Sequence, residues 1–232
     1  MNIKEMNWMQ LEEYLKQDDR AILPIGSVEQ HAYLSLCTDA ILAEKIAQDA
    51  AFSLQIPVFP ILYYGMTPHL KAFPGAISLK IPLYMELIQN ILEEIIRNGF
   101  HRVLVVNGHG GNNAICEVTS EVMANHPDVK IKFHNWWDGP KTWELIQAID
   151  PVATHASWLE NFPWTRLCNV IFPKHPKKAY NPDAIQLING KDLRSVLGDG
   201  SFGGVYEHSD EDMLEIWETA VKEIQESLEN WY

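Results

Sequence analysis

Hydrophobic and polar residues alternate along this chain with two periods, one typical of short buried strands and one typical of amphipathic helices. Short apolar runs predict strands at residues 22–26, 57–62, 103–106 and 129–136. Helical apolar spacing predicts helices at residues 8–16, 40–54, 82–97, 113–125 and 209–228. Strands separated by helices of about a dozen residues are typical of βαβ units. We therefore predict an α/β fold, a three-layer α/β/α sandwich with a mostly parallel central sheet.

Residues at the predicted helix ends support this segmentation. Asp39 is placed to cap the helix at 40–54, and Gly99 stops the helix at 82–97. Ser209 is placed to cap the last helix, and the acidic residues after it suit the positive end of the helix dipole.

Three later segments have weaker patterns. A short helix is predicted to begin near His155 and to be interrupted by Pro163. Residues 167–172 are interpreted either as a strand or as a buried connector. Residues 172–204 are richer in Pro, Lys, Gly and Asp, and we interpret them as an irregular excursion instead of a second domain. We therefore expect one domain over residues 1–232.

One glycine-rich turn is the most informative feature of the chain. The predicted strand at 103–106 runs into Asn107-Gly108-His109-Gly110-Gly111-Asn112, and a predicted helix follows. In open α/β sheets such turns lie at the carboxyl ends of strands, where ligands collect. Gly110 and Gly111 either donate backbone N–H groups to an oxyanion or a substrate, or only permit the tight turn.

Acidic and imidazole side chains gather in two further segments. Glu29 and His31 follow the predicted strand at 22–26, and their spacing places both on the same side of an extended segment. Asp39 comes next, and a later segment contains His155 and Glu160. Carboxylates combined with imidazoles suit Zn, Mn or Fe in the divalent state.

The composition of the chain argues against some classes of partner and indicates the redox state of its compartment. The chain has 232 residues and a formal net charge of −13, which argues against nucleic acid because phosphate binding needs a basic face. It has no apolar run of about eighteen residues, so no membrane span is expected. Cys37, Cys116 and Cys168 have no disulfide-type spacing, so we expect a reduced cytoplasmic compartment. Cys37 is interpreted either as a ligand or as a small buried hydrophobe.

Three motifs together resemble the creatininase (creatinine amidohydrolase) family. The first is Leu23-Pro24-Ile25-Gly26-Ser27-Val28-Glu29-Gln30-His31 with Thr38-Asp39, the second is the glycine turn, and the third is His155-Ala156 with Glu160. The order and spacing of the motifs extend over most of the chain. The turn combined with the Glu-Gln-His element is more specific than either motif alone.

The resemblance implies a creatininase-like fold and a hydrolytic centre with two divalent ions, which would be Zn, Mn or Fe. Glu29 and His109 would bind one ion, His31 and Glu160 would bind the other, and Asp39 would bridge the two. His155 would lie beside the centre as a proton-transfer group, and Glu160 is also counted among the catalytic residues. The resemblance further implies a homo-oligomer, such as a hexamer.

The sequence departs from the family pattern near the predicted ligands. The usual His-Gly-Pro-His-Leu-Pro run is His31-Ala32-Tyr33-Leu34-Ser35-Leu36 here, which is one residue shorter and lacks the second histidine. Creatininase has an acid two residues after the turn histidine, where this chain has Gly111, so the second ion would take its carboxylate from Glu160. Glu160-Asn161-Phe162 stands in place of the usual Glu-Thr-Ser. Creatinine is therefore not assigned as the substrate.

These residues would hydrolyse an amide-type C–N bond of a small molecule. A pair of divalent ions activates a water that attacks a carbonyl carbon, and His155 would protonate the leaving nitrogen. The expected substrate is a cyclic amide or a related small ring compound. Trp136 or Trp137 would stack on its ring, although core or interface packing is the alternative for each tryptophan.

Three alternative functions are compared with this one. The chain would be a hydrolase that opens a sugar-derived or cyclic ketone ring, or a non-catalytic family relative that keeps metal for structure or assembly. A nucleotide-binding module is the third alternative. It is disfavoured because the glycine turn has neither the Gly-x-Gly-x-x-Gly order nor the Lys-Ser/Thr pair of a P-loop.

Overall fold

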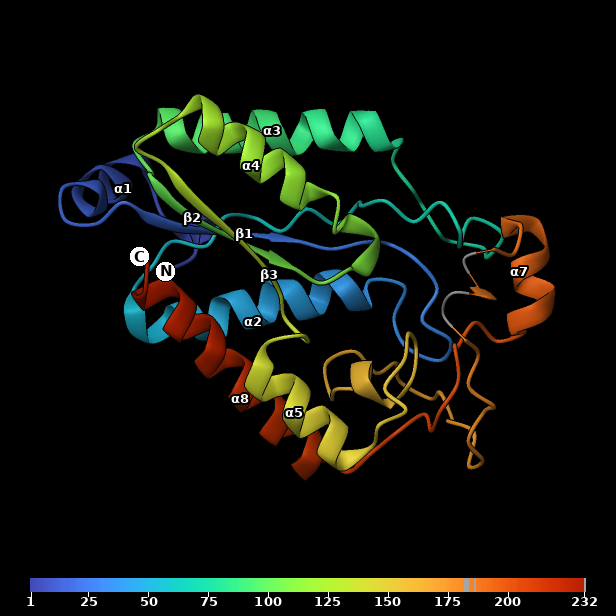
Figure 1. The fold of residues 1–232 in the computed structure, drawn as a ribbon. Helices are drawn as coiled ribbons and strands as arrows, with labels where there is room; N and C mark the ends of the chain where they lie inside the picture. The colour runs from blue at the N-terminus through green and yellow to red at the C-terminus, as the bar shows by residue number, and fades with distance from the viewer. Residues whose placement is uncertain (182–183, 186, 232) are drawn as a thin grey trace.

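A parallel three-stranded sheet lies at the centre of the computed structural model, which describes residues 1–181, 184–185 and 187–231. Its strands, in the order β1-β2-β3, are β1 (Arg20–Ile25), β2 (Arg102–Asn107) and β3 (Lys130–Asn135) (Figure 1). The register aligns Ile25 with Asn107 and Asn107 with Asn135, so the carboxyl ends of all three strands lie level.

Helices cover both faces of this sheet, and the predicted three-layer α/β sandwich is confirmed (Figure 1). One face is covered by α2 (Thr38–Leu54), α5 (Pro140–Ile149) and α8 (Asp210–Glu229). The other face is covered by α3 (Ile81–Arg97) and α4 (Ile115–Asn125). The chain begins with a 3-10 turn, η1 (Ile3–Glu5), and α1 (Trp8–Leu15), which has a capping box formed by Asn7 and Gln10.

Two hydrophobic cores follow from the alternation of side chains along the strands. Leu104 and Val106 of β2 pack in the core that contains α2 and α8. Val103 and Val105, the intervening residues, pack in the core that contains α3 and α4. Because both faces of the sheet are covered, β1 and β2 are nearly continuous buried apolar runs, as parallel strands usually are. β3 contains more polar residues and is mostly only partly buried.

Residues 57–62 are not a regular strand, contrary to the prediction. This segment runs beside β1 but forms only isolated bridges with it. The Ile22 N–H donates to the Pro57 carbonyl, and the Leu62 N–H donates to the Pro24 carbonyl. Pro24 and Pro60 have no N–H to donate, so the ladder is interrupted between these two bonds.

The structure corrects the predicted helix cap at Asp39. Helix α2 begins at Thr38, so Asp39 lies inside its first turn, and Cys37 is the N-cap residue without a side-chain cap bond. The Asp39 carboxylate bonds to side chains outside the helix instead. The predicted cap at Ser209 is confirmed, because its side chain accepts a hydrogen bond from the Asp212 N–H.

The later segments also differ from prediction. The helix expected from His155 onward is only a 3-10 turn, η3 (Trp158–Glu160). Residues 167–172 contain neither a strand nor a helix, and they are not a buried connector, since Leu167 is 48% exposed and Ile171 is 86% exposed.

The excursion at 172–204 contains a helix that was not predicted, α7 (Gly190–Leu197); residues 182, 183 and 186 of this excursion lie outside the described residues. Leu193 and Leu197 of α7 pack with Leu70 and Phe73 in a small separate cluster. Figure 1 shows α7 beyond the carboxyl ends of the strands, far from the two termini. In the described part of the chain, no helix has both the length and the apolar composition that a bilayer crossing requires.

Candidate metal centre

The level carboxyl ends of the parallel strands bring the predicted site residues together. Glu29 and His31 follow β1, and His109 follows β2 in the turn that leads to the 3-10 turn η2 (Gly110–Asn112). Asp39 comes from the first turn of α2. Glu160 ends η3. Segments that are distant in sequence therefore meet at one edge of the sheet, as ligand sites in open α/β folds do.

Two glycines allow the first turn of α2 to approach the strand ends. A Cβ atom at Gly108 would lie 2.1 Å from the Asp39 carbonyl oxygen. A Cβ atom at Gly26 would lie 2.5 Å from the Ala40 Cα. Any side chain at either position would push α2 away, so these glycines set the depth at which Asp39 enters the site.

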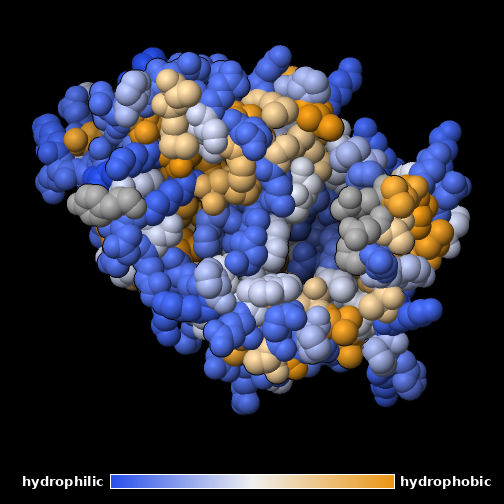
Figure 2. Space-filling view, in the orientation of Figure 1, coloured by the Kyte–Doolittle hydropathy of each residue, from blue (hydrophilic) through white to orange (hydrophobic). Residues whose placement is uncertain are grey.

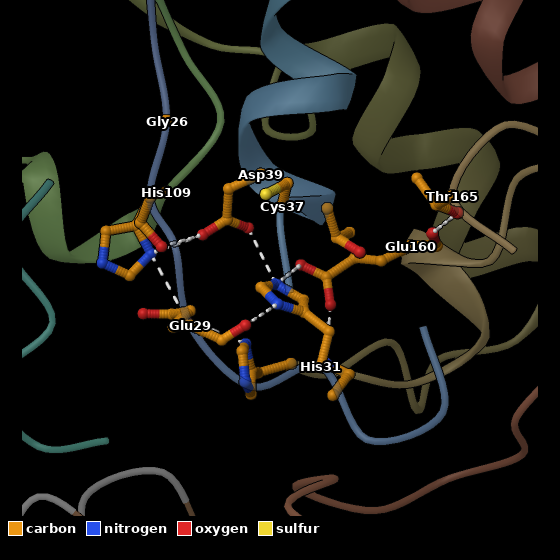
Figure 3. Close-up of polar contacts among 12 residues, drawn as sticks. Gly26, Glu29, His31, Cys37, Asp39, His109, Glu160 and Thr165 are labelled. Atoms are coloured by element: carbon orange, nitrogen blue, oxygen red, sulfur yellow. Dashed lines mark hydrogen bonds and ion pairs between the residues drawn. The ribbon is translucent and has the colours of Figure 1, made fainter. Parts of the chain in front are cut away.

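Asp39 lies between the two predicted ligand histidines (Figure 3). Its Oδ1 is 2.8 Å from His31 Nε2, and its Oδ2 is 2.9 Å from His109 Nδ1. The Ser27 hydroxyl donates to Oδ2 over 2.8 Å. Ser27, His31 and Asp39 are almost fully buried, and His109 is 9% exposed. One carboxylate thus faces two imidazoles with its two different oxygens.

Two more carboxylates flank this central triplet. Glu29 Oε1 is 3.4 Å from His109 Nδ1, and Glu160 Oε1 is 3.7 Å from His31 Nε2. The other oxygen of Glu160 accepts a 2.6 Å hydrogen bond from the Ala156 N–H. Ala156 has φ +55°, a left-handed conformation that costs energy in a residue with a side chain. This strained turn holds Glu160 toward His31.

Backbone carbonyls orient both histidines. His31 Nδ1 lies 3.3 Å from the Glu29 carbonyl oxygen, and His109 Nε2 lies 2.9 Å from the Met66 carbonyl oxygen. Each ring therefore has one nitrogen engaged by the backbone and presents the other to the carboxylates, an arrangement typical of metal-binding histidines. Gly111 leaves room for the His109 ring, because a Cβ atom there would lie 2.3 Å from Nε2.

The charges in the cluster are strongly coupled. Burial opposes positive charge on the imidazoles, but the carboxylates outweigh it and raise the pKa of His31 well above its usual value and that of His109 to about 9. Burial likewise opposes charge on the carboxylates, but the two histidines hold the pKa of Asp39 far below its usual range, and His31 lowers the pKa of Glu160. In the absence of metal, protons on the imidazoles balance the buried acids.

This donor set fits two divalent cations. Two groups of potential ligands share Asp39: Glu29, Asp39 and His109 form one, and His31, Asp39 and Glu160 form the other. A third group is Glu29, His31 and His155, and the donor atoms within each group lie within 4.8 Å of one another. Glu29 Oε2 is buried and has no hydrogen-bond partner, so it retains a lone pair for a cation. The residues predicted as ligands from the sequence thus lie together. Cys37 belongs to none of the three groups of potential ligands found among the described residues.

His155 lies beside the cluster, as expected of a proton-transfer group. Its Nδ1 is 3.7 Å from Glu29 Oε1, and its ring centroid is 4.6 Å from that of His31. Burial is the largest cause that lowers the pKa of His155, and the charge of His31 lowers it further. Unlike the two predicted ligand histidines, His155 therefore favours its neutral form.

The cluster opens into a cleft with a volume of about 710 Å³. Figure 2 shows a hollow on this face with hydrophilic residues at its depth. The four predicted substrate-binding residues, Trp136, Trp137, Gly110 and Gly111, all line the cleft. Trp136 is only 1% exposed and packs against Phe162 and Trp217, so it belongs mainly to the core. Trp137 is only partly buried and also lines the cleft.

Several cleft residues were missed by the sequence analysis. Thr67 is 3% exposed, lines the cleft and has a buried hydroxyl without a hydrogen-bond partner. Trp143 of α5 and Phe202 of the excursion complete the aromatic lining. Helix α5 and the excursion showed no signal that connected them to the glycine turn, so only the fold could place these residues. Among the described residues that line the cleft, none is Lys or Arg.

Comparison with known proteins gives a match over nearly the whole chain. The family model Creatininase, described as creatinine amidohydrolase, matches residues 4–228.

Curated relatives match over shorter regions. Creatinine amidohydrolase from Pseudomonas putida is 26% identical over 162 residues, which cover 64% of this chain and 62% of that enzyme. The 3-dehydro-scyllo-inosose hydrolase from Thermotoga maritima is 29% identical over 107 residues, which cover 45% of this chain and 34% of that enzyme. The matched regions therefore span less than two thirds of the length of these relatives.

Solved structures show the same fold. A crystal structure of creatininase superposes with a TM-score of 0.82 at 23% identity and covers 98% of this chain and 96% of its own. A manganese form of creatininase gives the same values. A variant of creatininase complexed with creatine has a TM-score of 0.80 at 22% identity, again covering 98% of this chain and 96% of its own.

Proposed function

The chain belongs to the creatininase family, and from this premise we propose that it is a metal-dependent hydrolase that cleaves an amide-type C–N bond in a cyclic amide or related small ring compound. The observation that carries the proposal is the position of Asp39, whose two oxygens face His31 and His109 separately. A carboxylate in this position is suited to bridging two cations.

The ligands divide naturally between two ions that share Asp39. Glu29 and His109 would hold one ion, and His31 and Glu160 would hold the other. Zn, Mn and Fe in the divalent state all suit these oxygen and nitrogen donors. When bound, such a pair of ions would lower the pKa of a water toward neutrality and polarise a substrate carbonyl.

The side chains of the protein would supply the remaining steps. His155 is neutral and its Nδ1 faces the carboxylates, so it is placed to take a proton when water adds to the carbonyl carbon. It would then return that proton to the nitrogen as the C–N bond breaks, yielding an acid and an amine. Glu160 would contribute through the ion that it holds and through its contact with His31.

The cleft lining favours a flat substrate without a negative charge. Trp137 offers a ring face for stacking, and Gly110 and Gly111 let a substrate approach the backbone of the turn. Because none of the described lining residues is Lys or Arg, a carboxylate or phosphate on the substrate would find no side-chain cation there.

A second candidate function is the opening of a sugar-derived or cyclic ketone ring. The similarity to the Thermotoga maritima hydrolase favours it, and a hydroxyl-rich ring would need polar partners such as Thr67 and Thr154 of the cleft.

We also propose that residues 1–232 form one domain and that the chain is cytoplasmic. We further propose that it assembles into a homo-oligomer such as a hexamer. Light scattering on the purified protein would measure this oligomeric state.

A substrate panel with controlled metal tests the proposal. The protein is stripped with a chelator, and Zn or Mn is restored at two equivalents per chain. Cyclic amides, including creatinine and simple lactams, are compared with hydroxylated cyclic ketones. The proposal expects metal-dependent ring opening in the first set. Turnover of the second set alone would support the second candidate, and full metal occupancy with no turnover on either set would contradict an enzymatic role.

A further inference from the structure

Three tryptophans line the cleft from the segment that connects β3 to α5, and their exposure rises along that segment. Trp136 is 1% exposed, Trp137 is partly buried and Trp143 is 41% exposed. Trp136 and Trp137 contact each other edge to face, with ring centroids 6.0 Å apart. Trp143, on the first turn of α5, has no aromatic partner among the described residues. Its indole ring is therefore available to a ligand at the mouth of the cleft.

Ile81 brings an apolar side chain to the same cleft from the other side of the sheet. It is the first residue of α3, which covers the face opposite to α5 (Figure 1), and it is 50% exposed. Leu70 and Phe202 add apolar surface to the lining, and both pack in the cluster around α7. Exposed apolar side chains that gather in one groove are typical of ligand-binding sites.

The cleft is larger than a small ring requires. Its volume of about 710 Å³ lies within the range of clefts that bury drug-sized ligands. A single small ring at the carboxylate cluster would fill only a fraction of this volume. The described residues that line the remainder include Ile81 and Trp143 but no Lys or Arg. A substituent that fills it would therefore be apolar and uncharged.

The helix that carries Trp143 is held in place by a buried acid of α8. Glu223 is 8% exposed, and its Oε1 accepts a 2.8 Å hydrogen bond from the Lys141 N–H. Its Oε2 accepts bonds from the Thr142 N–H over 2.9 Å and from the Thr142 hydroxyl over 2.6 Å. Gly139 permits this approach, because a Cβ atom there would lie 2.2 Å from Oε2. The carboxylate supplies the cap that Gly139 cannot, directly before Trp143.

The charge of Glu223 suits this position. Burial opposes charge on the carboxyl, but the hydrogen bonds from Thr142 and Lys141 outweigh it and hold the pKa of Glu223 below its usual value. A negative charge at a helix N-terminus stabilises the first turn. The Trp143 N–H closes that turn with a 2.7 Å bond to the Gly139 carbonyl oxygen. The backbone from which the indole projects is thus fixed by α8.

We propose that Trp143 and Ile81 form a subsite for an uncharged apolar substituent on the substrate ring, and that Glu223 is a positioning residue that holds Trp143 at this subsite. The substrate class is then a cyclic amide that carries an apolar group on the side remote from the metal centre. The inference rests on the proposed function for the ring at the metal centre, but binding of the substituent can be measured without turnover.

Matched hydantoins test the inference through binding. Hydantoin, a cyclic amide without a substituent, is compared with 5-benzylhydantoin and 1-benzylhydantoin, which carry one apolar group on carbon or on nitrogen. Calorimetry on the zinc-loaded protein gives the benzyl preference, defined as the Kd of hydantoin divided by the Kd of the tighter benzyl compound. We expect a preference of about tenfold or more, as for burial of a Phe side chain.

A benzyl preference below about threefold, which is less than one buried CH₂ group supplies, would overturn the inference. So would the failure of both benzyl compounds to bind at millimolar concentration. Turnover separates the inference from the proposed function. Hydrolysis of cyclic amides without a benzyl preference would remove only the inference, whereas the full preference in a protein that hydrolyses nothing would remove only the proposed function.

Variants with matched controls locate the subsite. Trp143→Ala is compared with Trp8→Ala, since Trp8 is 70% exposed on α1 and is not among the residues that line the cleft. Ile81→Ala is compared with Leu83→Ala, since Leu83 is 51% exposed on the same helix but is likewise outside the lining. We expect Trp143→Ala and Ile81→Ala to lower the benzyl preference, the former by about fivefold or more, and both controls to keep it. The full preference in Trp143→Ala would overturn the inference.

Glu223→Gln tests the positioning role. The variant keeps the shape of the side chain but turns one acceptor oxygen into an NH₂ group that opposes the N–H groups of α5. Glu226→Gln is the control, because Glu226 also contacts Lys141 but only at its exposed side chain. We expect the benzyl preference to fall by about threefold in Glu223→Gln and to stay at the wild-type value in Glu226→Gln.

A double variant shows whether Glu223 acts through Trp143. Glu223→Gln combined with Trp143→Ala should have the same benzyl preference as Trp143→Ala alone, because the positioned side chain is already absent. A further fall in the double variant, or the wild-type preference in Glu223→Gln, would overturn the positioning role. Because the preference is a ratio of two affinities for one protein, a general loss of metal or of folded protein would not mimic the expected result.

Discussion

Thr67 and Glu29 each carry a buried oxygen without a hydrogen-bond partner, and both line the same cleft. Leaving such an atom unpaired costs about 1–3 kcal/mol. An unpaired buried oxygen beside a cleft is a candidate partner for a ligand. We propose that Glu29 keeps its oxygen for a cation and that Thr67 keeps its hydroxyl for a polar group of the substrate.

A Thr67→Val variant tests the role of this hydroxyl. Val has nearly the same shape as Thr, so the variant removes an unpaired polar atom, and the free protein should gain about 1 kcal/mol of stability. Substrate binding should weaken, so KM should rise about fivefold or more, while Thr67→Ser stays close to wild type. Thermal unfolding and steady-state kinetics measure both effects. An unchanged KM together with reduced stability would assign the hydroxyl to the fold instead.

The elements that build the site meet at glycines. The ends of β1 and β2 press against the first turn of α2, and no side chain fits at Gly26 or Gly108. The position of Asp39 in the site is therefore set by the packing of a helix on two strand ends, and not only by its own side chain.

A Gly108→Ala variant tests this packing. Its methyl group would force α2 outward, so we expect a loss of about 1–3 kcal/mol of stability. Metal content should fall as well, because Asp39 moves with the helix. Gly110→Ala, two residues away, is the control, since a Cβ atom there meets nothing within 4 Å. Chemical denaturation and elemental analysis would measure both variants. Full metal content in a destabilised Gly108→Ala protein would show that the packing of α2 on the strand ends does not determine metal binding.

Predictability from the sequence differs between elements for physical reasons. The three regular strands and the long helices were predictable because their apolar periods are strong. Glu29, His31 and His109 were predictable as candidate ligands because they follow strand ends, whereas Asp39 and Glu160 were assigned through the family resemblance. Helix α5 was given no bounds from the sequence, and its N-terminus is held by α8: the Glu223 carboxylate accepts from the N–H groups of Lys141 and Thr142. Short helices depend on such tertiary contacts, which no local pattern contains. The hydrogen bond from the Gln30 side-chain amide to the Gly200 carbonyl oxygen could not be predicted either, because it joins residues 170 positions apart in sequence.

At the scale of the whole molecule, the cluster links stability to pH. In the metal-free protein the pKa of His109 is raised to about 9, above its usual value near 6.5, so the folded state binds more protons than the unfolded state between these values. Stability from this source is complete below about pH 6.5 and is lost as the pH rises through 9.

We therefore expect the metal-free protein to lose stability, on the order of 1–3 kcal/mol, between about pH 6.5 and 9. The apparent metal affinity should rise over the same range, because each ion has to displace protons from imidazoles. Denaturation at several pH values, with and without Zn, measures both trends. A metal-free protein whose stability rises with pH in this window would contradict the charge balance described for His31 and His109.

The account as a whole depends on two ions that share Asp39. Calorimetric titration of the metal-free protein with Zn, with elemental analysis of the product, measures this most directly. We predict two ions per chain for the wild type, no more than one for Asp39→Asn, and two for Asp138→Asn, a control acid that bonds only to Asn135 among the contacts found in the described residues. Two tightly bound ions in Asp39→Asn, or none in the wild type, would contradict the account.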